Sequence, residues 1–140
     1  MNELKYSNYD FFGLLYIIKK SSNFFKGSTR LQKIIMIGKY EYKLPFSFEF
    51  VRYHYGPFSF QLHTLVNDLI RAGIIEKQDV SSQVGLEAWY KLTNDGLSFF
   101  ESMKKDISSD ELEKLDKLWE KYRFLNKDAL VVRSKELFGW

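Results

Sequence analysis

A six-residue stretch, Tyr-His-Tyr-Gly-Pro-Phe at positions 53–58, places three aromatic rings and an imidazole around a glycine and a proline. Aromatic rings in such a turn can stack on nucleic-acid bases or anchor a protein partner. Alternatively, they lock the backbone where a strand turns into a helix, and Gly56 supplies the freedom that this turn needs. The aromatic turn, defined as Tyr53, Tyr55 and Phe58, is therefore one candidate binding site.

The residues that follow predict a helix at 58–72 with a polar side that could read DNA. Its apolar residues recur at helical spacing and leave polar side chains on the opposite side. Asn and Gln pair with adenine edges in the major groove, and Ser, Thr and His can contact several bases. The expected base contacts are Ser59, Gln61, His63, Thr64 and Asn67.

A second set of residues could contact phosphates. A helix is predicted to begin at Ser28 or Thr29, and the free backbone N–H groups at a helix start favour an anion. Three basic side chains lie at or near this start, and we expect them to neutralise phosphates. They are Lys26, Arg30 and Lys33.

Other kinds of chemistry are poorly represented. The chain has no cysteine, which excludes disulfides, thiolate zinc sites and cysteine nucleophiles. Its two histidines, His54 and His63, lack the spacing of metal ligands. The glycines are isolated rather than arranged in a phosphate-binding loop, and no GxSxG nucleophile motif is present. We expect neither an enzyme, nor a metal site, nor a cofactor.

Hydrophobic periodicity predicts one α+β domain, mostly α, over residues 1–140. The expected helices cover about 9–20, 29–43, 58–72, 93–105, 108–125 and 126–138. Their expected N-caps are Asn8, Thr93, Ser108 and Asn126. Gly38, inside the second helix, indicates that a neighbouring backbone comes close to it.

The remaining segments predict strands. An alternating run at 46–55 indicates one strand, and Pro57 is expected to begin the helix after it. Gly73 suits a left-handed cap at the end of that helix. Beyond it, residues 74–80 are expected to pair with 88–92 across a turn and to form a two-stranded ribbon.

This order of elements resembles a winged helix-turn-helix. The stretches LIRAGIIE at 69–76 and YKLTNDG at 90–96 are similar to the wing signature of prokaryotic winged-helix regulators. TRLQKIIMIGKY at 29–40 and FEFVRYHYGPFS at 48–59 resemble the YwgA-like group of small prokaryotic winged-helix proteins. That group is similar in turn to the Panacea (SocA-like) antitoxin domain. The resemblance covers roughly residues 28–104.

The resemblance implies a wing at about 74–92 and a C-terminal helical extension at about 108–138. It implies DNA regulation or the neutralisation of a protein partner, and it supplies no catalytic residue. The first expectation is therefore a transcriptional regulator that binds double-stranded DNA through the helix at 58–72.

The charge distribution leaves two functions open. Residues 1–57 carry nine Lys and Arg against four Asp and Glu, and such a basic half favours a polyanionic partner. However, the helix at 58–72 has no Lys or Arg in its first three turns, and the wing carries Asp79 and Glu87 at its turn. DNA-binding wings usually insert basic residues into the minor groove. The alternative is a protein-interaction module, antitoxin-like or an adaptor, that does not bind DNA.

Assembly and location complete the expectations. A two-fold axis would let a small domain read two half-sites, so we expect a homodimer. Its interface is expected on the aromatic first helix and on C-terminal aromatic residues, namely Trp119, Tyr122, Phe124, Phe138 and Trp140. No apolar run reaches the roughly 18 residues that a membrane span needs, so we expect a cytoplasmic protein without a membrane contact.

Overall fold

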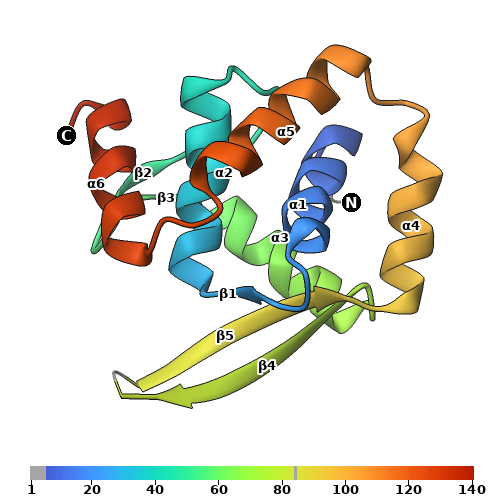
Figure 1. Cartoon of the computed structure of the whole chain (residues 1–140), viewed down its shortest axis with the longest axis horizontal. Helices are drawn as coiled ribbons and strands as arrows, with labels where there is room; N and C mark the ends of the chain where they lie inside the picture. Colours follow the sequence, from blue (N-terminus) through green and yellow to red (C-terminus); the bar gives the residue numbers. More distant parts are fainter. Residues whose placement is uncertain (1–5, 84) are drawn as a thin grey trace, which may run out of the picture.

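Six helices and two small antiparallel sheets are formed by residues 6–83 and 85–140, which the computed structural model describes (Figure 1). Helix accounts for 57% and strand for 18%, so the expected α+β class, mostly α, is confirmed. The helices are α1 (Asn8–Lys20), α2 (Ser28–Glu41), α3 (Phe60–Arg71), α4 (Asn94–Lys104), α5 (Ser109–Tyr122) and α6 (Lys127–Phe138). The strands are β1 (Phe25–Lys26), β2 (Val51–Tyr53), β3 (Gly56–Phe58), β4 (Ile75–Ser82) and β5 (Gly85–Leu92).

The larger sheet contains the predicted ribbon. Strands β4 and β5 pair antiparallel from Ile75↔Leu92 to Ser82↔Gly85, so the expected pairing is confirmed and is longer than predicted. The short β1 adds to the other side of β5, which gives the order β1-β5-β4. Figure 1 shows the free end of the ribbon projecting beyond the helices. Val84, in the predicted turn, lies outside the described residues.

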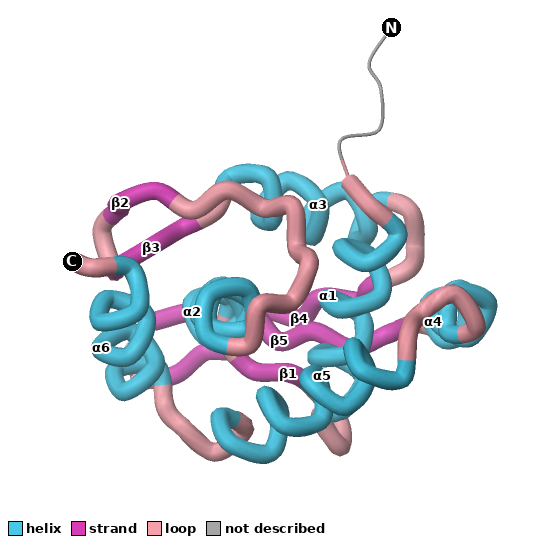
Figure 2. Tube along the Cα trace, turned by 90° about the horizontal axis from the view of Figure 1, so that it is seen from above, coloured by secondary structure: helices cyan, strands magenta, loops and turns pink. Residues whose placement is uncertain are grey.

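Helix α1 lies inside the protein and packs against α4, α5 and β5. Its apolar side chains are fully buried on several sides of the helix, including Phe12, Leu14, Leu15 and Ile17. The expected position of the dimer interface on this helix is wrong, because the apolar side chains of α1 are buried within the monomer. Figure 2 shows α2 near the middle, with α6 and the β2–β3 hairpin on one side and α4 on the far side.

The strand predicted at 46–55 is wrong over its first half. Phe46, Phe48 and Phe50 are buried and alternate with exposed residues as expected, yet residues 43–50 pair with no strand. Side chains replace the missing neighbour. The Asp10 carboxylate accepts the Ser47 N–H at 2.8 Å, and the Lys39 ammonium donates to the Phe48 carbonyl. An alternating pattern reports burial, and it does not report what satisfies the backbone.

The expected helix start at Pro57 is also wrong. Strands β2 and β3 form a tight hairpin around His54 and Tyr55, in the register Val51↔Phe58 and Tyr53↔Gly56. Gly56 has φ +105°, which favours glycine and lets the chain reverse. Helix α3 therefore begins at Phe60, two residues after the start of the helix predicted at 58–72.

Caps fix most helix boundaries. The side chains of Thr93, Ser108 and Asn126 each accept a backbone N–H in the first turn of α4, α5 and α6, as predicted. Helix α1 is capped by Ser7 rather than Asn8, in a capping box with Asp10.

Two glycines mark close contacts inside the fold. A Cβ on Gly38 would meet side chains, chiefly Leu118 at 2.9 Å, so the expected close backbone is wrong there. The close backbone lies at Gly96 instead, where a Cβ would stand 2.1 Å from the Ile74 carbonyl oxygen. Gly73 has φ +77°, as its predicted cap role requires.

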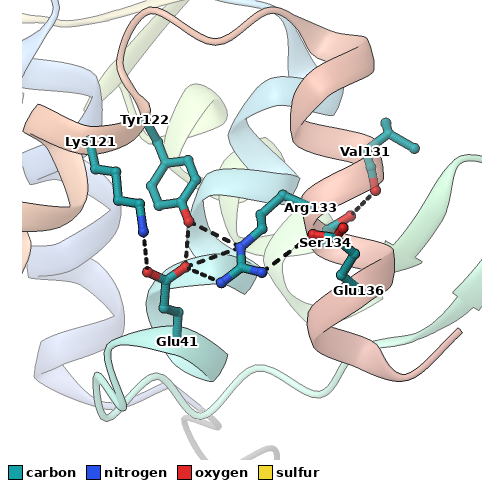
Figure 3. Close-up of polar contacts among 7 residues, drawn as sticks. All are labelled: Glu41, Lys121, Tyr122, Val131, Arg133, Ser134 and Glu136. Carbon is teal, nitrogen blue, oxygen red and sulfur yellow. Dashed lines mark hydrogen bonds and ion pairs between the residues drawn. The ribbon is translucent and has the colours of Figure 1, made fainter.

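A polar cluster ties the C-terminal helices to the end of α2 (Figure 3). The Glu41 carboxylate accepts from Lys121 Nζ at 2.9 Å and from Arg133 Nη2 at 3.0 Å, and the Tyr122 hydroxyl also donates to it. Burial alone would raise the pKa of Glu41, but the hydrogen bonds from these three side chains outweigh burial and lower that pKa. We call Glu41, Lys121, Tyr122 and Arg133 the Glu41 clasp.

None of the helices in residues 6–83 and 85–140 is long and apolar enough to cross a membrane.

Candidate binding site

A cavity of about 300 Å³ opens between the β2–β3 hairpin, the first turns of α2, one side of α3 and the ribbon. Its inner lining is made of buried side chains, among them Leu31, Leu62 and Tyr90. Tyr55 and His63 line it with exposed side chains and form its rim. We call this space the aromatic cavity.

The rim of the aromatic cavity continues into a surface cluster of rings. The Tyr53 ring lies 4.9 Å from Phe58 and 5.2 Å from Phe60, between ring centroids, and Phe58 lies 5.9 Å from the His63 ring. Tyr55 is 65% exposed and Phe60 is 51% exposed, so these rings are not core residues. We call the cluster the aromatic face; it consists of Tyr53, His54, Tyr55, Phe58, Phe60 and His63.

The cavity lining carries positive charge and no acidic side chain. Lys33, Lys77 and His63 line it, whereas none of its lining residues is Asp or Glu. Lys33 is only 1% exposed, and its ammonium donates to the Pro57 carbonyl at 2.8 Å. Burial, with a contribution from Lys135, lowers the pKa of Lys33 to about 8. None of the ion pairs among the described residues includes Lys33.

The start of α2 borders the same cavity. Gly27 occupies the N-cap position with φ +100°, and no side chain caps the helix there. Ser28 and Thr29 line the cavity, so the positive end of the α2 dipole faces it. Burial raises the pKa of Tyr90 to about 12, although a hydrogen bond with the Ser28 side chain opposes this shift.

The structure brings six of the predicted site residues to the aromatic cavity. They are Lys33, Tyr53, Tyr55, Phe58, His63 and Asn67. Asn67 lies one turn after His63, and their side chains are 3.3 Å apart at Nδ2 and Nε2. Two sets that the sequence suggested for different tasks, the aromatic turn and part of the polar helix side, therefore share one site.

Ser59 and Gln61 do not fit their predicted role as base contacts. Ser59 is fully buried, because its hydroxyl caps α3 by accepting the Leu62 N–H at 3.1 Å. The Gln61 amide donates to Glu49 at 3.1 Å and accepts from the Ser59 hydroxyl at 3.0 Å. Both side chains hold the start of the helix. Thr64 is exposed outside the cavity.

The three predicted phosphate contacts also separate. Lys33 is buried, and a buried ammonium cannot meet a phosphate on the surface. The Arg30 guanidinium donates to the carbonyls of Leu125 at 3.1 Å and Arg123 at 3.0 Å, which ties α2 to the α5–α6 connection. Of the three, only Lys26 is exposed, and its ammonium lies 4.4 Å from the Trp89 ring centroid. The predicted phosphate-binding set is therefore corrected to this one residue.

Sequence reasoning missed several residues of the site. Phe60 was placed inside a helix that was predicted to start at residue 58, so its exposure on the first turn was not foreseen. Lys77 and Tyr90 come from neighbouring positions of the paired strands, in the register Lys77↔Tyr90. The predicted pairing of 74–80 with 88–92 includes both residues, but it fixes neither their register nor the side of the sheet that faces α3.

The comparisons with known proteins add no family to this picture: no protein-family model matches the chain, and no curated protein matches it. Within the part of the chain that the structure describes, no group of three or more His, Cys, Asp or Glu side chains is placed to hold a metal ion.

Proposed function

We propose that this chain is a non-catalytic winged-helix module whose aromatic face docks a protein partner. The order of elements supports the winged-helix architecture. Helices α1, α2 and α3 precede the ribbon, and β1 joins it in the order β1-β5-β4. In this architecture α3 takes the place of the recognition helix, β4 and β5 form the wing, and α5 and α6 are the C-terminal extension.

The exposed aromatic face is the observation that carries the docking proposal. Protein interfaces are enriched in Tyr and Phe, and binding energy concentrates where such rings surround a pocket. Here Tyr53, Tyr55 and Phe60 remain exposed beside a cavity, although exposing an apolar ring to water is unfavourable. Contiguous apolar surface of this kind marks an interaction site more often than it marks a monomer's ordinary exterior.

The charges near α3 favour a protein over DNA. DNA-binding surfaces are much more positive than protein-binding ones. Arg71, at the end of α3, is paired with Asp68, and Lys77 on the wing is paired with Asp79 at 3.6 Å. Arg30 and Lys33 are engaged with backbone carbonyls. Few cations near this face are therefore free to neutralise phosphates.

Double-stranded DNA is the second candidate, and the element order together with three polar side chains favours it. His63, Thr64 and Asn67 lie on α3 and could reach base edges in a major groove. Lys26 alone of the predicted phosphate contacts is exposed. One neutralised phosphate per protomer gives a slope of only about −0.9 in log K against log salt.

Site-specific photocrosslinking in the native cells tests the docking proposal. A photoreactive amino acid at Tyr55 should yield discrete protein adducts. The same group at Leu97, which is exposed on α4, is the matched control and should not yield these adducts. Adducts that form equally from both positions, or that consist only of nucleic acid, would contradict the proposal.

Fluorescence anisotropy tests the second candidate. Random and genomic duplexes should show no binding at about 50 mM salt if the module recognises only a protein. Binding that weakens between about 50 and 200 mM salt, and that depends on Lys26, would instead support the DNA function.

A homodimer remains a prediction. With α1 buried, a dimer must use other apolar surface, such as Phe124, which is 82% exposed, and Val132 on α6. Light scattering at tens of micromolar protein should return a dimer mass, and a monomer mass would contradict the prediction.

A further inference from the structure

We infer that the aromatic cavity holds an acidic side chain of the partner, an Asp or Glu that stands next to a large apolar residue in a short docked segment. This inference rests on the proposed docking function and specifies what the docked segment must contain. It assigns a task to the charge of Lys33, whose burial excludes the phosphate contact predicted for it.

The size of the cavity limits the occupant. Sites for small ligands span about 300 to 1,000 Å³. At about 300 Å³, the aromatic cavity lies at the lower end of that range and fits one side chain with its neighbouring backbone. The apolar part of the occupant can contact Leu62 and Val66, which are buried on the inner side of α3, while the rings of the hairpin close over it.

The charge of the lining determines the polar part of the occupant. Lys33 and Lys77 line the cavity and no lining residue is a carboxylate, so an anion is attracted and a cation is repelled, although Asp79 partly offsets the charge of Lys77. The uncapped start of α2 at Ser28 and Thr29 adds partial positive charge on the same side. Basic, aromatic and apolar groups together complement an acidic residue with an apolar neighbour.

Lys33 is the side chain that makes this a specific site. An ammonium has three N–H donors, and the Pro57 carbonyl accepts from one of those of Lys33. A buried cation is costly when no opposite charge is near, and Lys135 adds repulsion rather than relief. A carboxylate entering the cavity would reduce both penalties. We therefore expect Lys33 to form the charge pair with the partner.

The test uses peptides because the partner protein is unidentified. Random twelve-residue peptides displayed on phage are selected against the full chain at about 50 mM salt, and enriched sequences are then synthesised. Their affinities are measured by fluorescence anisotropy, with amidated and free carboxyl termini compared. We expect the enriched peptides to share an internal Asp or Glu beside an aromatic or large aliphatic residue.

Amide substitution measures the proposed pair directly. Replacing the peptide's Glu by Gln, or Asp by Asn, should weaken binding about tenfold, as should Lys33→Met in the protein. The two changes combined should weaken binding little more than either alone, because both remove the same pair. Lys104→Met removes a charge from the exposed side of α4 and should leave the affinity unchanged.

Lys77→Gln protects the test against a folding defect in Lys33→Met. Lys77 lines the cavity from the wing and is exposed, so the fold should tolerate its loss, and binding should fall about two- to threefold. Circular dichroism confirms that each variant is folded before its affinity is measured.

The outcomes distinguish a failure of the proposed acidic anchor, meaning the partner's Asp or Glu in the cavity, from a failure of the docking function. Peptides that depend on Tyr55 and Phe60 but tolerate both Lys33→Met and Lys77→Gln would overturn the acidic anchor and leave the docking face intact. Peptides that bind only with a free carboxyl terminus would also overturn the internal acidic residue. If no enriched peptide depends on Tyr55→Ala or Phe60→Ala, both the anchor and the docking proposal fail.

Discussion

The two ends of α2 hold charged side chains in opposite ways. At the C-terminal end, the Glu41 carboxylate is surrounded by donors from α5 and α6 (Figure 3). Nearer the N-terminal end, the Lys33 ammonium is buried beside the aromatic cavity and donates to the Pro57 carbonyl, and another cation, Lys135, disfavours its charge. The Glu41 charge is paired and holds two helices in place, whereas none of the ion pairs among the described residues includes Lys33.

A lowered pKa has opposite meanings at these two positions. The lowered pKa of Glu41 shows that the fold stabilises the charged carboxylate, because donors outweigh the effect of burial. The lowered pKa of Lys33, about 8, shows that the fold destabilises the charged ammonium. Substitution should therefore weaken the fold at Glu41 and should change its stability much less at Lys33.

Glu41→Ala should give the largest loss of stability, about 2 to 3 kcal/mol, because it leaves the buried Tyr122 hydroxyl without its acceptor. Urea denaturation at pH 7 measures the change in the free energy of unfolding. Glu113→Ala is the control, because it removes an exposed Glu that pairs with Lys117 at 3.6 Å within one helix and should cost under about 0.5 kcal/mol. Equal losses in both variants would show that the Glu41 clasp is no stronger than a surface pair.

The pH dependence should distinguish the two charges next. The contribution of Glu41 is fully present above its unfolded pKa of about 4.3 and is lost as the pH falls through its lower folded pKa. The difference between the wild type and Glu41→Ala should therefore shrink below about pH 4.

For Lys33, both states bind the proton below pH 8, so the cost of burying the ammonium is complete there. Between about pH 8 and 10.5 only the unfolded chain keeps the proton, so stability should rise with pH by about 1.4 kcal/mol for each unit that separates the two pKa values. The Lys33→Met variant should lack this rise in urea denaturation series, and a rise of equal size in both proteins would refute the assignment to Lys33.

Lys33→Met at pH 7 should change stability by no more than about 1 kcal/mol, in either direction. The variant removes a buried charge and retains apolar volume, which often leaves stability unchanged or raises it. It also loses the hydrogen bond to Pro57, which opposes that gain. A loss above about 2 kcal/mol would show that Lys33 is a structural residue like Glu41, and the comparison between the two ends of α2 would fail.

Local sequence signals predicted the parts of this fold that depend on neighbours in the chain. Caps at Thr93 and Ser108 follow from side chains that bond within three residues, and the pairing of 74–80 with 88–92 follows from hydrophobic pattern and turn residues. The strand over 46–50 failed because the partners of its backbone, Asp10 and Lys39, lie on α1 and α2. No local pattern encodes such contacts.

The candidate site was predictable as a set of residue types but not as a geometry. Composition identified the aromatic turn, and six predicted residues do meet in the cavity. The sequence did not show that Lys26 is exposed and Lys33 is buried, because helical position alone does not show which basic side chain is covered by a later hairpin. Charge counted along the chain therefore overstated the charge that this face presents.

Tyr122→Phe should lower stability by about 1 kcal/mol, less than Glu41→Ala, and it separates the contribution of the hydroxyl from that of the charges in the Glu41 clasp. The hydroxyl donates to Glu41 and accepts from Arg133 Nε at 3.2 Å, while the ring is buried and remains so in the variant. Both hydrogen bonds of the hydroxyl are lost in the variant, but Glu41 keeps its bonds to Lys121 and Arg133, so the ion pairs survive. Among the contacts that lower the pKa of Glu41, the hydrogen bond from the Tyr122 hydroxyl has the largest effect. NMR titration of the Glu41 carboxyl should therefore show a higher pKa in Tyr122→Phe. An unchanged Glu41 pKa would mean that the two cations alone stabilise the carboxylate, and the contrast with Lys33 would then be one of ion pairing only.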